Sequence, residues 1–146
     1  ISPYSRYTLA QYYENASQDF YAARQMRLAI ELITEVPGQN MTIGFIDLFD
    51  FDPHHRRAGV GILIGEKRYR RKGFALEALK LMANYSFNTL NLHQIYCHIE
   101  MANEASLALF AAAGFKTCGV IRDWIAYDGK WHNVTMMQQL RPRDLV

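Results

Sequence analysis

The sequence has little of several features that would place it in a special class. It contains only two cysteines and four prolines among 146 residues, which excludes a disulfide-rich framework and a proline-rich chain. Its charges almost balance, with a net charge of +2, so composition gives no case for a nucleic-acid partner. No apolar run approaches the ~18 residues of a membrane span, and no signal peptide is visible. We therefore expect a cytoplasmic globular domain without a membrane partner.

Familiar phosphate-binding and metal-binding signatures are also missing. No run reads G-x-x-x-x-G-K-[ST], which excludes a P-loop. Gly59, Gly61 and Gly65 are spaced one residue too far for G-x-G-x-x-G and lie within or before a strand. His54 and His55 stand near two aspartates, but the spacing matches no metal template. We expect a solvated loop there and no metal.

Along the chain, segments with apolar residues at helical spacing alternate with segments at strand spacing. They predict one or two short helices within 8–28, strands at 27–35, 41–48 and 57–64, a helix at 72–90, a strand at 94–101, a helix at 103–113 and a hairpin of strands 115–127 and 131–140. Asp50 to His55 is expected as a loop, and Cys97 and Cys118 as buried thiols in strands. The pattern predicts one α/β domain over residues 1–146, with a single mostly antiparallel sheet flanked by helices. The chain begins at Ile1 rather than Met, which is consistent with a missing N-terminal strand.

The stretch from Val60 to Leu81 carries the first functional signal. An apolar strand is followed by a basic segment with cations at 67, 68, 70, 71 and 72, and then by a helical pattern. The free N–H groups and positive dipole end of a helix N-terminus favour anions. Gly73 lets a phosphate approach the backbone without a Cβ in the way. This order predicts a polyphosphate site, although a basic surface loop that opens a helix would read the same way.

The spacing Arg70-x-x-Gly73-x-Ala75 resembles the pyrophosphate loop of the GNAT (Gcn5-related) N-acetyltransferases. A second motif follows in the right order: Asn103-x-x-Ser106-x-x-Leu109-Phe110-x-x-x-Gly114-Phe115 resembles the family's N-x-x-(A/S)-x-x-(L/F)-Y-x-x-x-G-F. Either motif alone is weak, since the second also describes a capped helix that ends in glycine. Two such motifs on the expected elements are hard to obtain by chance.

The resemblance covers residues from about 8 to 140 and is closest to one branch of the family. Segments 55–58, 85–87, 90–93 and 127–137 look like the branch of spermidine/diamine and ribosomal-protein N-terminal acetyltransferases. It implies the GNAT fold, with strands splayed around the CoA site, and acetyl-CoA as cosubstrate. The cofactor-binding residues it implies are Ile62, Leu63, Ile64, Arg70, Arg71, Lys72, Gly73, Phe74, Ala75, Asn103, Ser106 and Phe110.

Two departures from the family pattern bear on chemistry. Many members have a Tyr where this chain has Phe110, and that Tyr is usually assigned as the acid that protonates the leaving thiolate. Polyamine-acetylating relatives tend to carry Glu at the position of Gly59. The first departure leaves the general acid unassigned, and the second weakens the expectation of a polyamine.

His98 is the candidate base. It lies five residues before Asn103, where relatives that acetylate protein N-termini carry a Glu in that role. Imidazole suits proton abstraction near neutral pH. Glu100 follows on the same strand face and could attract a cationic substrate or orient His98. The alternative for each residue is that it is an ordinary strand residue without a catalytic role.

The resemblance implies an acetyl-CoA-dependent N-acetyltransferase whose acceptor is a small-molecule primary amine, such as a polyamine, or a protein N-terminus. An amino sugar or antibiotic amine is a second option. A non-catalytic acyl-CoA-binding module is the rival suggested by Phe110, and a nucleic-acid-binding domain the rival suggested by the basic segment. The sequence leaves the acceptor, a homo-oligomer and the biological role open.

Overall fold

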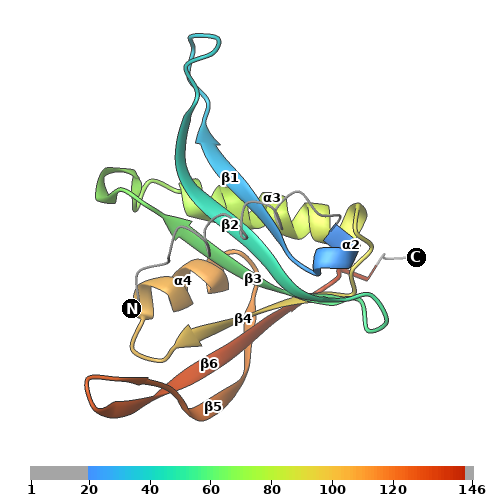
Figure 1. Ribbon diagram of the computed structural model, residues 1–146, viewed down its shortest axis with the longest axis vertical. Helices are drawn as coiled ribbons and strands as arrows, with labels where there is room; N and C mark the ends of the chain where they lie inside the picture. The colour runs from blue at the N-terminus through green and yellow to red at the C-terminus, as the bar shows by residue number, and fades with distance from the viewer. Residues whose placement is uncertain (1–19, 144–146) are drawn as a thin grey trace.

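The computed structural model describes residues 20–143 of the chain. They form one six-stranded sheet in the order β1-β2-β3-β4-β6-β5, with helices beside it. The elements are α2 Phe20–Ala23, β1 Met26–Leu32, β2 Met41–Asp52, β3 Arg57–Ile64, the 3₁₀ turn η1 Lys67–Tyr69, α3 Phe74–Asn88, β4 Gln94–Glu100, α4 Glu104–Ala112, β5 Lys116–Tyr127 and β6 Lys130–Leu140. Figure 1 shows α3 lying behind the sheet and α4 in the angle between β3 and β4. The expected α/β class with one mostly antiparallel sheet is confirmed.

The first three strands form the expected antiparallel meander. The predicted loop at Asp50–His55 is partly wrong, because β2 continues to Asp52. A register shift lies between Phe49 and Asp52, and Asp50 has a left-handed φ of 48°. A bulge of this kind accommodates extra residues in β2, so that the strand pairs with β3 again at Asp52. β1 ends at Leu32 rather than at 35, and most of the helical segment expected at 8–28 lies outside the described residues.

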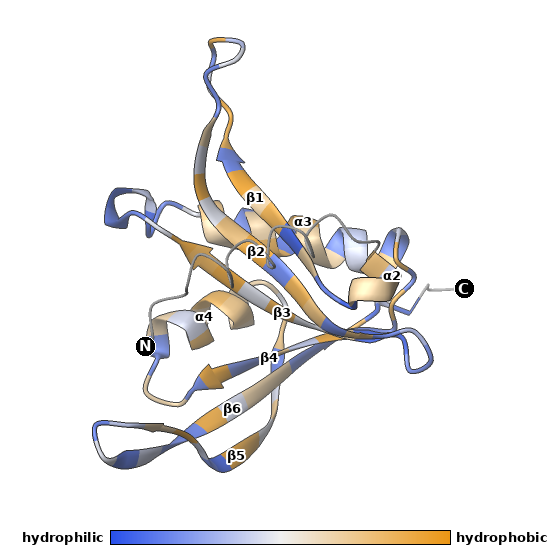
Figure 2. Ribbon diagram, in the orientation of Figure 1, coloured by the Kyte–Doolittle hydropathy of each residue, from blue (hydrophilic) through white to orange (hydrophobic). Residues whose placement is uncertain are grey.

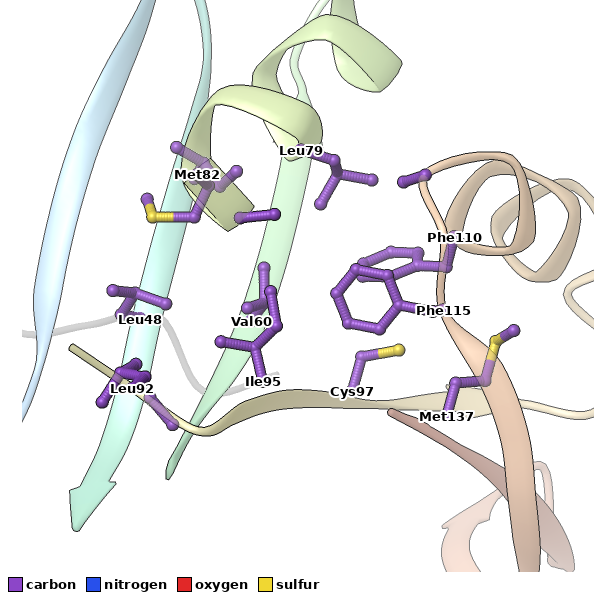
Figure 3. Packing of buried hydrophobic residues seen from close by; sticks show 14 of the residues in the cluster. Leu48, Val60, Leu79, Met82, Leu92, Ile95, Cys97, Phe110, Phe115 and Met137 are labelled. Atoms are coloured by element: carbon purple, nitrogen blue, oxygen red, sulfur yellow. The ribbon is translucent and has the colours of Figure 1, made fainter. Parts of the chain in front are cut away.

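Helix α3 connects β3 to the parallel strand β4 and covers one face of the sheet. Its buried residues recur at helical spacing and include Leu79, Met82 and Phe87. Leu79 and Met82 pack near Val60 and Ile95, as Figure 3 shows, and Phe87 belongs to the same buried cluster. The segment between β3 and α3 is the hydrophilic loop at the left of Figure 2. The crossover therefore delivers a polar, basic turn to one end of a buried helix.

The last hairpin inserts β6 between β4 and β5, which the order of elements along the chain does not reveal. Asp128 and Gly129 both have positive φ, 52° and 67°, as a tight two-residue hairpin turn requires. Cys97 is a buried free thiol in β4, whereas Cys118 in β5 is exposed, so the prediction of two buried thiols is wrong for Cys118. No helix within residues 20–143 is long and apolar enough to cross a bilayer.

Candidate active site

The sheet opens between its two parallel strands, β3 and β4. They are paired only where Arg57–Gly59 meets Gln94–Tyr96. Beyond these residues, β3 continues along β2 alone and β4 continues along β6 alone. Because alternate backbone groups of a strand point to its two edges, the 60–64 segment presents N–H and C=O groups to the gap. An extended ligand could therefore pair with this edge as an added strand does.

A cavity of about 670 Å³ lies beside this gap. The free edge of β3, the loop before α3 and the first turns of α3 and α4 form its wall. Most of the cofactor residues expected from the sequence line it: Ile62, Leu63, Ile64, Arg70, Arg71, Gly73, Ala75, Asn103 and Ser106. The structure thus brings two motifs that are distant in the sequence to one cavity.

The loop before α3 is shaped to present backbone N–H groups. Arg71 and Gly73 both have left-handed backbone, with φ of 60° and 83°. Left-handed residues in a short turn direct neighbouring N–H groups to one side and form an anion-binding concavity. Helix α3 begins directly afterwards, so its first N–H groups and the positive end of its dipole lie at the same place. A phosphate is the ligand that this geometry favours.

The basic side chains of this loop have different roles. The Arg70 guanidinium donates from Nε to the Ile64 carbonyl at 3.2 Å and from Nη2 to the Gly65 carbonyl at 3.4 Å, which ties the loop to the end of β3. Lys72 is not among the residues that line the cavity. Phe74 lines a second, apolar cavity of about 580 Å³ between α3 and β1. Lys72 and Phe74, both expected at the cofactor, therefore lie outside the 670 Å³ cavity.

Asn103 caps helix α4 at the cavity wall. Its Oδ1 accepts a hydrogen bond from the Ser106 backbone N–H at 3.2 Å, as the sequence predicts for an N-cap. The amide Nδ2 has no hydrogen-bond partner within residues 20–143, so it can donate to a ligand carbonyl or phosphate. The helix ends with Ala113 as its C-cap, and the next residue, Gly114, has a φ of 104°.

Phe110 lies in the core and does not line the cavity. Its side chain is 4% exposed and meets Phe115 edge to face, with ring centroids 5.0 Å apart. Figure 3 shows both rings directed toward Leu79 and Cys97. Phe110, expected at the cofactor, therefore lies outside this cavity, and its neighbour Leu109 lines it.

The outer face of β4 carries the candidate chemistry. Cys97 and Ile99 are buried against the helices, so the alternating residues Tyr96, His98 and Glu100 lie on the opposite face. The shared face predicted for His98 and Glu100 is thus found. His98 and Glu100 follow the last residue of β4 that pairs with β3, so they border the gap, and the cavity borders it on the β3 side.

Aromatic rings form a row along this outer face. Phe49 lies 6.4 Å from Tyr96, Tyr96 lies 5.6 Å from His98, and His98 lies 6.5 Å from Trp124, all between ring centroids. Burial and the nearby Asp50 carboxylate raise the pKa of Tyr96, which therefore stays protonated near neutral pH.

Bulges place the two ends of the row. Phe49 stands at the β2 bulge, and its ring fills the space above Gly59, where an added Cβ would come within 2.3 Å of it. Trp124 stands at the register shift of β5, beside Asp123, whose N–H donates to Asn133 Oδ1 at 3.0 Å. Bulges commonly re-aim side chains next to active sites. The glycine at 59 is thus explained by packing against Phe49.

Sequence reasoning missed Trp124, Tyr127 and His132 as neighbours of β4. They lie on a hairpin whose second strand pairs with β4, so their position depends on the strand order. The Tyr127-Asp128-Gly129 turn was a usable signal, because it fixes the register of the hairpin.

The loop with His54 and His55 is held by its own hydrogen bonds. The His55 N–H donates to Asp52 Oδ1 at 2.9 Å, and this bond is the main reason that the pKa of Asp52 is lowered. No group of three or more His, Cys, Asp or Glu within residues 20–143 could hold a metal ion.

Comparison with known proteins agrees with this geometry. A family model described as an acetyltransferase (GNAT) domain matches residues 2–116. The spermidine N(1)-acetyltransferase of Vibrio cholerae is 31% identical over 107 residues, which cover 73% of this chain and 61% of the relative. The uncharacterized N-acetyltransferase YoaA of Bacillus subtilis is 30% identical over 127 residues, covering 87% of this chain and 71% of that protein.

Solved structures show the same fold. The crystal structure of spermidine N-acetyltransferase from Vibrio cholerae in complex with CoA and spermine superposes with a TM-score of 0.81 at 27% identity, covering 96% of this chain and 78% of that one. The matched region spans only 61% and 50% of the curated spermidine relatives from Vibrio cholerae and Escherichia coli. The matched domain and the shared fold together show that this chain belongs to the GNAT family of acetyltransferases.

Proposed function

We propose that the chain is an acetyl-CoA-dependent N-acetyltransferase that acetylates a primary amine, with a polyamine as the preferred acceptor. The observation that carries the proposal is the gap between β3 and β4. The cavity with the loop before α3 lies along the β3 edge of this gap, and His98 lies on the β4 edge, on the opposite face of the sheet. The similarity to spermidine N-acetyltransferases supports both the donor and the acceptor class.

The cavity has the donors that a CoA ester needs. The N–H groups of the Arg71–Gly73 turn and of the start of α3 would hold the pyrophosphate. The free edge of β3 at 60–64 would pair with the amides of the pantetheine arm, and the Asn103 amide would donate to the same arm. When bound, acetyl-CoA supplies an acetyl group activated as a thioester.

His98 is the proposed general base. Its side chain is exposed on the outer face of β4, at the point where β3 and β4 have separated. The acceptor ammonium loses a proton to His98 directly or through one water, and the free amine forms the N–C bond as the C–S bond breaks. Thiols have pKa values of about 8.5, so the thiolate can leave without a dedicated acid such as the Tyr that Phe110 replaces.

The outer face of β4 favours a cationic acceptor. Aromatic rings and a carboxylate are the groups that bind alkylammonium ions, and Tyr96, Trp124 and Glu100 supply them beside His98. A protein N-terminal amine is the second candidate. It is supported by the [Ribosomal protein uS5]-alanine N-acetyltransferase of Escherichia coli, which is 32% identical over 74 residues, or 51% of this chain.

A steady-state assay of free thiol with acetyl-CoA and a panel of acceptors tests the proposal. The panel contains spermidine, a peptide with N-terminal alanine and an amino sugar. We expect spermidine to give the highest kcat/KM. Tight binding of acetyl-CoA without turnover of any amine would instead identify a non-catalytic acyl-CoA-binding module, and the peptide as the best acceptor would transfer the assignment to protein N-termini.

A further inference from the structure

The β5–β6 hairpin fixes one carboxylate on the outer face of β4. The Tyr127 hydroxyl donates a hydrogen bond to Glu100 Oε1, and His132 Nδ1 lies 3.4 Å from the same oxygen. The Tyr127 and His132 rings are stacked, with centroids 3.6 Å apart and planes inclined by 3°. Each ring therefore restrains the other, and together they restrain the orientation of the carboxylate.

The restrained carboxylate keeps one oxygen available. Glu100 Oε2 has no hydrogen-bond partner within residues 20–143, and the Glu100 side chain is 24% exposed. The hydrogen bond to Glu100 is the main reason that the pKa of Tyr127 is raised, so this hydroxyl stays a donor at neutral pH. A fixed anion with a free oxygen is suited to accept hydrogen bonds from an ammonium group.

The position of Glu100 relative to His98 defines what could bind there. The two residues are separated by one residue on the same strand face, which corresponds to roughly 7 Å along the strand. This spacing is comparable to the distance between the two nitrogens of a short aliphatic diamine. Trp124 is 58% exposed and lies beside His98, so its ring can cover the alkyl chain and add cation–π attraction.

We propose that Glu100, positioned by Tyr127 and His132, binds the second ammonium group of a diamine or polyamine whose reacting amine lies at His98. The inference rests on the proposed function, and it names the group that selects the acceptor. Tyr127 and His132 act as positioning residues through Glu100. A monoamine or a protein N-terminus has no second cation at this spacing, so this subsite favours diamines over both.

The test compares 1,4-diaminobutane with butylamine, which has the same chain length and one ammonium group. In Glu100→Gln the ratio of kcat/KM for the diamine to that for the monoamine should fall about tenfold, because a hydrogen-bonded charge partner is lost. Tyr127→Phe keeps the ring stacked on His132 and removes only the hydroxyl, so the ratio should fall roughly threefold. Asp128→Asn removes a charge from the same hairpin without touching Glu100 and should leave the ratio at the parent value.

A binding measurement separates this inference from the proposed function. Calorimetric titration of 1,4-diaminobutane in the presence of CoA should give a Kd about tenfold weaker for Glu100→Gln than for the parent, whether or not the protein turns over. Equal Kd values, or equal kcat/KM ratios in an active enzyme, would overturn the subsite. Transfer to neither amine with the Kd difference intact would instead overturn the proposed transferase activity and keep the subsite.

Discussion

The two sides of the gap between β3 and β4 differ in the chemical groups that they present. On the helix side, the cavity offers mainly backbone groups: the turn at Arg71–Gly73, the start of α3 and the free edge of β3. On the outer side, the site consists of side chains, and they come from β2, β4, β5 and β6. Backbone groups persist under substitution, whereas a row of side chains can be changed one residue at a time.

The largest expected effect is a loss of catalytic efficiency from a substitution on the outer side. His98→Ala should lower kcat/KM by roughly 10²–10⁴-fold, the usual size of a general-base contribution. The Kd for acetyl-CoA should stay near the parent value, because His98 does not line the 670 Å³ cavity proposed to hold it. A matched Glu100→Gln variant tests the assignment. Near-parent turnover in His98→Ala beside a collapse in Glu100→Gln would transfer the role of base to Glu100.

On the helix side, the largest expected effect is on stability. Phe110→Ala should lower the free energy of unfolding by about 3–5 kcal/mol, because Phe110 is 4% exposed and packs on Phe115. Leu81→Ala on the exposed face of α3 is the control and should change it by less than about 1 kcal/mol. Chemical denaturation measures both. Comparable losses in the two variants would contradict the core position of Phe110.

The helix side could be predicted in detail because its signals are local. A strand, a basic turn with Gly73 and a helix are consecutive in the sequence, and the Asn103 cap is read from a spacing of three residues. The meander and the Asp128-Gly129 hairpin are local in the same sense. Residues close in the sequence determine such elements, so they can be predicted from one sequence.

The outer side could be predicted only in part. The shared face of His98 and Glu100 follows from strand periodicity, but their partners depend on β6 inserting between β4 and β5. The bulges that place Phe49 and Trp124 leave no regular signature, since each breaks the period of two on which strand prediction rests. Phe110 was expected at the cofactor because its motif position was known, but its burial depends on packing with Phe115.

The smallest expected effect concerns the two thiols. Burial raises the pKa of Cys97 from 9.0 to about 12, whereas Cys118 is exposed. Near pH 8.5 a thiol-alkylating reagent should modify Cys118 and spare Cys97 until the protein unfolds, as mass spectrometry would show. The Cys97 thiol loses its proton at a lower pH in the unfolded chain than in the folded protein. Its contribution to the free energy of unfolding should therefore be fully present below pH 9 and be lost as the pH rises toward 12. Equal labelling of both thiols in the folded protein would contradict this burial.

Calorimetric titration of acetyl-CoA into Gly73→Asp and Gly38→Asp tests most directly whether the helix side of the gap binds the donor. The two glycines have nearly the same positive φ, 83° and 82°, and an added Cβ meets nothing within 4 Å at either. Both substitutions therefore place a side chain at a positive φ. Of the two glycines only Gly73 lines the cavity, where the new carboxylate would repel phosphates. We predict an affinity at least about tenfold weaker for Gly73→Asp and close to the parent for Gly38→Asp. Equal affinities for the two variants would contradict a phosphate site at this loop.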